Sequence, residues 1–198
     1  METSLLITLF LGAQLTGLSD ALLPPWLAAF AEYPLLVKGN IEGGENYLQI
    51  FSKEEQSAVA MATIDDKLAG FLVGLPLDKY PFSTELHDFN DVDQPFYYLS
   101  DSVVLPAYRK QGIVEKLFHS LLEKVQSWNY KKMCIATVVR EEDHPLKPEG
   151  YSHDLIWQQL GFEKTSVQVK ALWPTIVDQQ GSVEERENTL EVLVRELT

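Results

Sequence analysis

The stretch that decides the fold runs from Ser102 to Leu117 and reads SVVLPAYRKQGIVEKL. An apolar strand segment leads through a short basic turn into a helix. The helix is amphipathic, because apolar side chains recur at spacings of three and four from Ile113 to Trp128. The first N–H groups of a helix have no partners within it, and the helix dipole adds partial positive charge there. The stretch therefore predicts a strand–turn–helix unit that can bind an anion such as a pyrophosphate.

The turn combines features that suit an anion. Arg109 and Lys110 supply positive charge in an otherwise acidic chain. Gly112 allows a tight turn and lets an anion approach the backbone closely. An ordinary strand-to-helix turn would explain the same residues, because one glycine and two basic side chains are not a specific pattern. The rest of the chain has to decide between the two interpretations.

Around this unit the pattern predicts an α/β domain with a mixed sheet. Strands are expected at 5–11, 58–64, 67–75, 96–105, 133–139, 166–172 and 190–197. The segments 58–64 and 67–75 flank Asp65-Asp66 and predict an antiparallel hairpin. The segments 96–105 and 133–139 enclose the amphipathic helix, which predicts a parallel pair.

The remaining segments are expected to be helices and connections. Ala13 to Ala31 predicts two short helices separated at Pro24 and Pro25, because an interior proline removes a helix hydrogen bond. Residues 154–160 predict a short helix that ends at Gly161. Loops are expected at 140–153 and in the polar, acidic segment 83–94, and an acidic turn is expected at 184–187.

Composition limits the classes of partner and site. The 198 residues, 45% of them hydrophobic, suit a single domain over residues 1–198. The one cysteine, Cys134, excludes an internal disulfide and a cysteine zinc cluster, and no metal site is expected. The net charge of −13 argues against nucleic acid or an anionic membrane as the main partner. It would favour cationic small molecules or basic peptides, but the simpler explanation is an acidic surface that keeps the protein soluble.

The apolar segment 5–11 also bears on location. It is far shorter than the ~20 residues that span a bilayer. Glu2 stands where a signal peptide carries positive charge, so a buried first strand explains the segment better. We therefore expect a cytoplasmic protein.

In this setting Ser102–Leu117 resembles motif A of the GNAT acetyltransferases, Arg/Gln-x-x-Gly-x-Gly/Ala, with Arg109, Gly112 and Val114 at the three defined positions. Other segments resemble further parts of the family: the hairpin with Gly70-Phe71, LIWQQLGF at 155–162 as motif B, DHPLKPEGY at 143–151 and LEVLVREL at 190–197. The resemblance implies a GNAT-like (acyl-CoA N-acyltransferase) fold, with a mixed central sheet of about six to seven strands and flanking helices.

The resemblance also implies an activity. It is that of an N-acetyltransferase that uses acetyl-CoA as co-substrate and acetylates a primary amine, of a small molecule or a peptide, by direct attack in a ternary complex. The pantetheine arm would bind the backbone of Val103, Val104 and Leu105, with the Val103 N–H as donor to the thioester oxyanion. The pyrophosphate would lie in the turn formed by Arg109, Lys110, Gln111, Gly112, Ile113 and Val114.

The candidate catalytic residues follow from the chemistry of the acceptor. An alkyl ammonium of pKa ~10.4 must lose a proton before it attacks, so a general base helps. Asp101 on the strand before motif A is the first candidate, although it could instead hold a water or bind the ammonium charge. His144 and Tyr151 are candidates for an acid or an acceptor contact, and loop anchoring is the alternative for both.

Two departures from the family pattern keep a second hypothesis open. Val114 stands where the family usually has Gly or Ala, and Trp157 stands at the position of the tyrosine that protonates the leaving thiolate in many members. Both departures favour a non-catalytic acyl-CoA-binding sensor or scaffold as the alternative function. Exposed strand edges are compatible with a homodimer.

Overall fold

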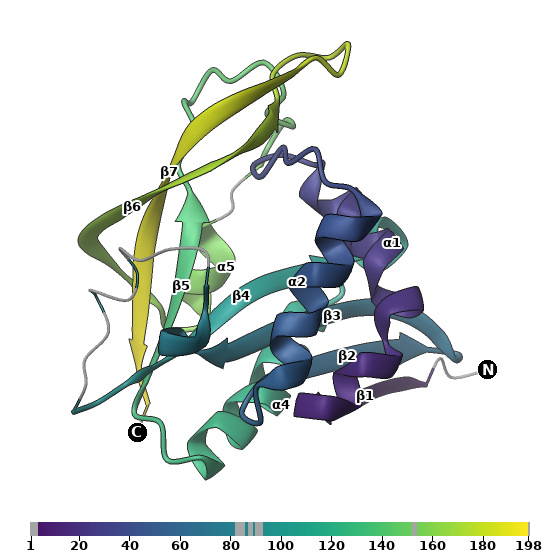
Figure 1. Ribbon diagram of the computed structural model, residues 1–198, viewed down its shortest axis with the longest axis vertical. Helices are drawn as coiled ribbons and strands as arrows, with labels where there is room; N and C mark the ends of the chain where they lie inside the picture. Colours follow the sequence, from purple (N-terminus) through teal and green to yellow (C-terminus); the bar gives the residue numbers. More distant parts are fainter. Residues whose placement is uncertain (1–3, 82–85, 87–88, 90–92, 152–153, 198) are drawn as a thin grey trace.

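In the computed structural model, which describes residues 4–81, 86, 89, 93–151 and 154–197, seven strands form one mixed sheet (Figure 1). The strand order is β1-β2-β3-β4-β5-β7-β6, and β4 and β5 form the parallel pair. The strands are β1 (Leu5–Leu11), β2 (Ala58–Ile64), β3 (Lys67–Pro76), β4 (Phe96–Val104), β5 (Lys132–Val138), β6 (Glu163–Ile176) and β7 (Val183–Glu196). The predicted mixed sheet is confirmed.

Helices cover both faces of the sheet (Figure 1). Helices α1 (Ser19–Phe30) and α2 (Ile41–Lys53) pack on one face, and α4 (Ile113–Ser127) and α5 (Asp154–Gln159) pack on the other. Short 3-10 turns lie at η1 (Gly12–Gly17), η2 (Leu77–Lys79) and η3 (Pro106–Tyr108).

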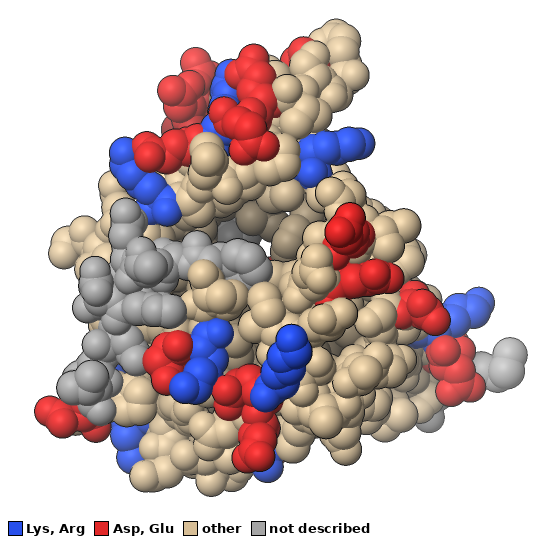
Figure 2. Space-filling model, in the orientation of Figure 1, with Lys and Arg blue, Asp and Glu red and all other residues tan. Residues whose placement is uncertain are grey.

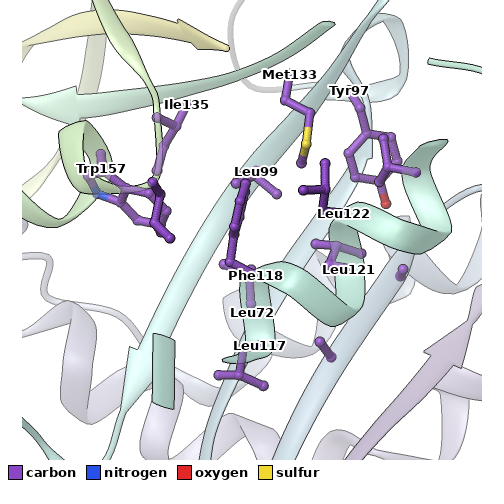
Figure 3. Packing of buried hydrophobic residues seen from close by; sticks show 14 of the residues in the cluster. Leu72, Tyr97, Leu99, Leu117, Phe118, Leu121, Leu122, Met133, Ile135 and Trp157 are labelled. Atoms are coloured by element: carbon purple, nitrogen blue, oxygen red, sulfur yellow. The ribbon is translucent and has the colours of Figure 1, made fainter. Parts of the chain in front are cut away.

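The core on the α4 face fixes the helix that follows the basic turn (Figure 3). The apolar stripe predicted from the sequence is the stripe that the helix buries: Ile113, Leu117, Phe118, Leu121, Leu122 and Val125. Each large apolar side chain that is fully buried contributes about 1.5–3 kcal/mol. The start of α4 is therefore held firmly against the sheet, and with it the turn that precedes the helix.

The β2–β3 hairpin is confirmed, with Ile64 opposite Lys67. Asp65 and Asp66 both have positive φ, at 49° and 61°. A two-residue turn of this kind follows the natural twist of the strands, and Asp is one of the side chains that tolerate it.

The prediction of two helices separated at Pro24 and Pro25 is wrong. Both prolines lie inside α1, and the break lies at Leu18, between η1 and α1. An interior proline costs a helix about 3 kcal/mol. The burial of three large side chains of the same helix offsets this cost: Leu22, Leu23 and Trp26.

The prediction of an acidic turn at 184–187 is also wrong. These residues belong to β7, where Glu185 lies opposite Pro174 and Glu187 opposite Leu172. The turn lies at 177–182 instead, with Gly181 at φ 81°. Acidic residues are accepted in this strand because they are exposed and because basic side chains of β6 pair with them, as Lys170 does with Glu187.

Helix α2 was not predicted from the sequence. Asn40 could have indicated its start, because the Asn40 side chain caps the helix by accepting a 2.8 Å hydrogen bond from the Gly43 N–H. The predicted exposed connection at 83–94 lies largely outside the described residues. Of its described residues, Leu86 is buried.

Candidate active site

The parallel strands β4 and β5 pair along only part of their length. The register runs from Phe96 opposite Lys132 to Leu99 opposite Ile135, and beyond Leu99 strand β4 continues to Val104 paired with β3 only. Among the described residues, the edge of β4 beyond Leu99 thus has no ladder partner on the β5 side. Backbone groups that lose their ladder partners need others, so this strand opening is suited to a ligand.

A β-bulge at Ser100 reverses the faces of the second half of β4. Val73 lies opposite Asp101 and Gly74 opposite Leu99, which leaves Ser100 as the extra residue. Before the bulge, Leu99 packs on the α4 face, whereas after it the odd-numbered Val103 packs on the α1–α2 face. The bulge therefore directs Asp101 to the side of the sheet that α1 and α2 cover.

A cavity of about 500 Å³ lies on that side, between helices α1 and α2, strands β4 and β5, and the β6–β7 hairpin. Figure 2 shows the surface hollowed between the hairpin and the helices. Its walls are mostly apolar or aromatic, and of the described charged residues only Asp101 and Lys38 line it. The volume is that of a small-molecule site.

Asp101 is the buried acid of this cavity. Burial raises the pKa of its carboxyl to about 6, and neighbouring polar groups of Ser100, Tyr47 and Trp26 oppose the rise. The clearest of these contacts is a 2.8 Å hydrogen bond that the Tyr47 hydroxyl donates to Oδ2 of Asp101. With this pKa the carboxylate is roughly nine-tenths ionised at pH 7, so it can bind a cation or accept a proton.

Aromatic side chains surround the carboxylate. The Trp26 and Tyr47 rings lie 5.0 Å apart edge to face, and the Tyr80 and Tyr98 rings lie 4.6 Å apart. The buried indole N–H of Trp26 favours the charged form of Asp101, although Nε1 has no hydrogen bond of standard geometry to any described residue. Sequence reasoning did not identify Trp26, Tyr47, Tyr80 or Tyr98 as residues of the site. These residues come from distant segments, so no local pattern marks them.

Three contacts show which way the backbone N–H and C=O groups at the end of β4 point. The Leu105 N–H donates to Ala69 O of β3 at 2.9 Å, while Val104 O accepts from Arg109 Nε at 3.0 Å on the other side. A Cβ on Gly70 would lie only 2.6 Å from Val103 O, which therefore also faces β3. Because successive peptide groups alternate in direction, the Val104 N–H faces the strand opening and the Val103 N–H does not. This alternation corrects the choice of Val103 as oxyanion donor.

The turn into α4 has the geometry expected of an anion site. Lys110 and Gly112 have positive φ, at 62° and 70°, and Gly112 is the N-cap of the helix. No side chain among the described residues caps α4, so the N–H groups of its first turn remain available to a ligand. A Cβ on Gly112 would meet only Glu115 Oε2, at 3.9 Å, which leaves space for a phosphate beside the backbone.

The side chains of this turn divide into two groups. Arg109 Nη2 forms an ion pair with Glu32 Oε2 at 2.7 Å, so Arg109 ties the turn to the segment after α1. The Gln111 amide donates to Ala107 O at 3.3 Å, and Ile113 is buried in the core. Lys110 is exposed and Val114 is half-buried. Most of these side chains therefore shape the turn, and its backbone is the part that can contact an anion.

A family model described as the acetyltransferase (GNAT) family matches residues 17–147, about two-thirds of the chain. The chain belongs to the GNAT acetyltransferase family. The predicted family and class of enzyme are confirmed. A comparison with curated protein sequences finds no match.

Solved structures share the GNAT fold over nearly the whole chain. An N-acetyltransferase of Staphylococcus aureus Mu50 has a TM-score of 0.62 at 11% identity, covering 98% of this chain and 99% of its own. A ribosomal-protein-alanine N-acetyltransferase of Brucella melitensis has a TM-score of 0.61 at 15% identity, covering 97% and 99%. A GNAT family acetyltransferase of Elizabethkingia anophelis, solved with acetyl-CoA bound, has a TM-score of 0.55 at 16% identity, covering 96% and 98%. The predicted fold is confirmed, including α5, β6 and β7 beyond the matched residues.

Three residues that were singled out from the sequence make packing contacts away from the cavity. Trp157 of α5 is buried in the α4-face core and packs edge to face on Phe162 at 5.8 Å. The rings of His144 and Tyr151 pack on Tyr33, at 5.6 and 4.8 Å, and neither residue lines the cavity. His144 Nδ1 also accepts a 3.2 Å hydrogen bond from the Leu146 N–H. This geometry supports loop anchoring for His144 and Tyr151.

Membrane and metal sites can be addressed only within the described residues. None of the helices described there has the length and apolar character needed to cross a membrane. No group of three or more His, Cys, Asp or Glu side chains in the same part of the chain could hold a metal ion.

Proposed function

We propose that this chain is an N-acetyltransferase that transfers the acetyl group of acetyl-CoA to a primary amine by direct attack in a ternary complex. The separation of β4 from β5 beyond Leu99 carries the proposal. It joins the cavity that holds Asp101 on one face of the sheet to the uncapped start of α4 at the end of the same strand. Acceptor and donor would meet in the strand opening.

Acetyl-CoA would lie along the open edge of β4. The Val104 N–H faces the opening and is the donor that we assign to the thioester oxygen as it becomes negative. The pyrophosphate would contact the backbone from Arg109 to Val114, where the space beside Gly112 admits it. The Elizabethkingia protein of this fold was solved with acetyl-CoA bound, which supports the choice of co-substrate.

Asp101 would act on the acceptor. Its carboxylate would bind the incoming ammonium and take one proton from it, which frees the lone pair of the amine. The amine nitrogen would then attack the thioester carbon, and the carbon–sulfur bond would break with CoA leaving as the thiolate. The second proton lost by the nitrogen would pass to this thiolate. The gap between a pKa of about 6 for Asp101 and the ~10.4 of a free alkyl ammonium is large. The mostly apolar cavity reduces this difference in pKa, because desolvation lowers the pKa of an ammonium group.

A non-catalytic acyl-CoA sensor is the second candidate, favoured by Trp157 at the position of the family's tyrosine acid. A thiol of pKa ~8.5 leaves readily as the thiolate, so the lack of that acid costs a transferase little. Thiol release from acetyl-CoA in the presence of an amine panel separates the two functions. Turnover with any amine supports the transferase, whereas calorimetric binding of acetyl-CoA without turnover would leave the sensor.

We extend the proposal to residues 1–198 as a single GNAT domain, since β6 and β7 complete both the sheet and the cavity wall. A cytoplasmic location and a homodimer stay predictions from the sequence. Buried Cys134, whose thiol pKa is raised by burial, is compatible with a reducing compartment and is unsuited to act as a nucleophile.

A further inference from the structure

We infer that the acceptor is a small primary amine with a single positive charge, attached to an apolar or aromatic group. The inference rests on the proposed function and deepens it, because it names the class of amine. It is carried by the charge, the ring content and the closure of the cavity on the α1–α2 face.

The charge of the cavity limits the charge of the acceptor. Asp101 is the one acid among the described residues that line it, and Lys38 is the one base. A second ammonium group on the acceptor would lose its hydration without gaining a carboxylate there, which is costly. The net charge of −13 favours cations in general, and on the face seen in Figure 2 acidic side chains lie on the hairpin, over the helices and across the lower part of the molecule. The protein therefore attracts cations broadly, and the part of the cavity wall that the structure describes offers one carboxylate for one ammonium group.

The rings of the cavity fit both ends of such an amine. Trp26, Tyr47, Tyr80 and Tyr98 lie around the carboxylate, and aromatic faces attract an ammonium group. The indole N–H of Trp26 and the Tyr47 hydroxyl both favour the charged form of Asp101, which is the form that binds an ammonium group. Other parts of the walls are apolar: Leu23, Leu27, Phe30, Val169, Ala171 and Leu190. These side chains would cover an apolar or aromatic tail.

One side of the cavity is closed by residues 33–38, which we call the strap. The strap is bonded to β6, because the Lys38 N–H donates to Pro174 O at 2.8 Å and the Ile176 N–H donates to Leu36 O at 2.7 Å. Arg140 also bonds to the strap, because its Nε donates to Pro34 O at 2.7 Å and its Nη2 donates to Leu35 O at 3.0 Å. A wall that is bonded on two sides favours a small molecule over a polypeptide segment that must run through the site.

The test compares four acceptors in a thiol-release assay with acetyl-CoA: 2-phenylethylamine, spermidine, kanamycin and a lysine-containing peptide. We expect kcat/KM for 2-phenylethylamine to exceed each of the others at least tenfold. Preference for the polyamine, the aminoglycoside or the peptide would overturn the inference and leave the transferase function intact.

A second measurement decides the inference if no amine is turned over, an outcome that contradicts the proposed function. Calorimetry then compares the binding of 2-phenylethylamine and spermidine to the CoA-loaded protein. Ala171→Leu places a larger side chain in the cavity. It should lower kcat/KM and the binding affinity for 2-phenylethylamine at least tenfold, with acetyl-CoA binding retained. Ala28→Leu makes the same change at an exposed position of α1 outside the cavity and should have no effect. Equal binding by the wild type and Ala171→Leu would refute the assignment.

Discussion

The Tyr47 hydroxyl donates a 2.8 Å hydrogen bond to Oδ2 of Asp101 and so joins helix α2 to strand β4 at the cavity. This bond favours the charged form of the acid and partly offsets the rise that burial causes in its pKa. Tyr47, an uncharged residue of α2, thus helps to set the pH at which the site can bind an ammonium group.

Tyr47→Phe should raise the pKa of Asp101 above its value of about 6, because the variant loses a donor to the carboxylate. A hydrogen bond to a charged group is worth about 1.5–3 kcal/mol, so a shift of roughly one pH unit is expected. The acidic limb of kcat/KM should move to higher pH by that amount. Carboxyl-carbon NMR titration measures the same shift without an acceptor.

The matched control is Tyr130→Phe, which removes a 2.9 Å bond from a tyrosine hydroxyl to Gln56 Oε1, with neither residue among those that line the cavity. Its pH profile should follow the wild type. An unmoved Asp101 titration in Tyr47→Phe would show that the bond does not control the acid.

Asp101→Asn should lower kcat by about 10²–10⁴-fold, the usual contribution of a general base, and should abolish the acidic limb of the pH profile. Acetyl-CoA binding should persist, because Asp101 lies on the acceptor side of β4. Unchanged turnover with an unchanged profile would remove Asp101 from catalysis.

The same variant should be more stable than the wild type at neutral pH. The carboxyl pKa is about 6 in the folded protein against an ordinary 3.8, so the folded state holds the proton more tightly. The contribution of this group to the stability of the wild type is therefore fully present below pH 3.8 and is lost as the pH rises through 6, by about 3 kcal/mol in all. Asn carries no charge, so urea unfolding should show its advantage growing between pH 4 and 7. Parallel stabilities across that range would contradict the buried charge.

Gly112→Leu should weaken acetyl-CoA binding at least tenfold, because the side chain would occupy the space beside the first turn of α4. The left-handed backbone at this position, with φ 70°, adds about 1–2 kcal/mol of strain. Gly150→Leu is the control, since Gly150 also has φ 70° and lies in open space in a loop. Calorimetry should show a loss of affinity for Gly112→Leu alone. Equal affinities would refute the phosphate site, whatever the stabilities.

Val114→Ala should tighten acetyl-CoA binding several-fold, since it removes a branched side chain from the first turn of α4 at a position where the family carries Gly or Ala. Val114 is half-buried against the core, so the variant should lose about 1 kcal/mol of stability. Val183→Ala on the exposed hairpin should leave the affinity unchanged. Weaker binding by Val114→Ala would show that the valine supports the turn and does not crowd the ligand.

Those parts of the fold that depend on local pattern were predictable from the sequence. The stripe from Ile113 to Val125 and the Asp65-Asp66 turn act through spacing and backbone preference, which a sequence displays directly. The prolines of α1 and the glutamates of β7 misled the prediction because tertiary packing and cross-strand pairing outweighed local preference there.

The site was predictable along β4 and the turn and not across the cavity. Asp101 and Gly112 adjoin a recognisable strand–turn–helix unit. Tyr47, Tyr80 and Trp173 reach the cavity from separate parts of the chain, and the strap depends on Arg140, which lies far from Pro34 in the sequence. Such a wall is a product of topology, so no short motif can mark it.

The extra residue at Ser100 decides how far along strand β4 the acceptor acid lies from the core residue before it. Deletion of Ser100 would place Asp101 directly after Leu99, and regular alternation would keep the acid on the α1–α2 face while β3 pairs along the whole strand. A GNAT chain without this bulge would therefore carry an equivalent acid one residue after the position of Leu99, and not two. In surveys of relatives, a one-residue gap at Ser100 has to be allowed before the acid is scored as absent.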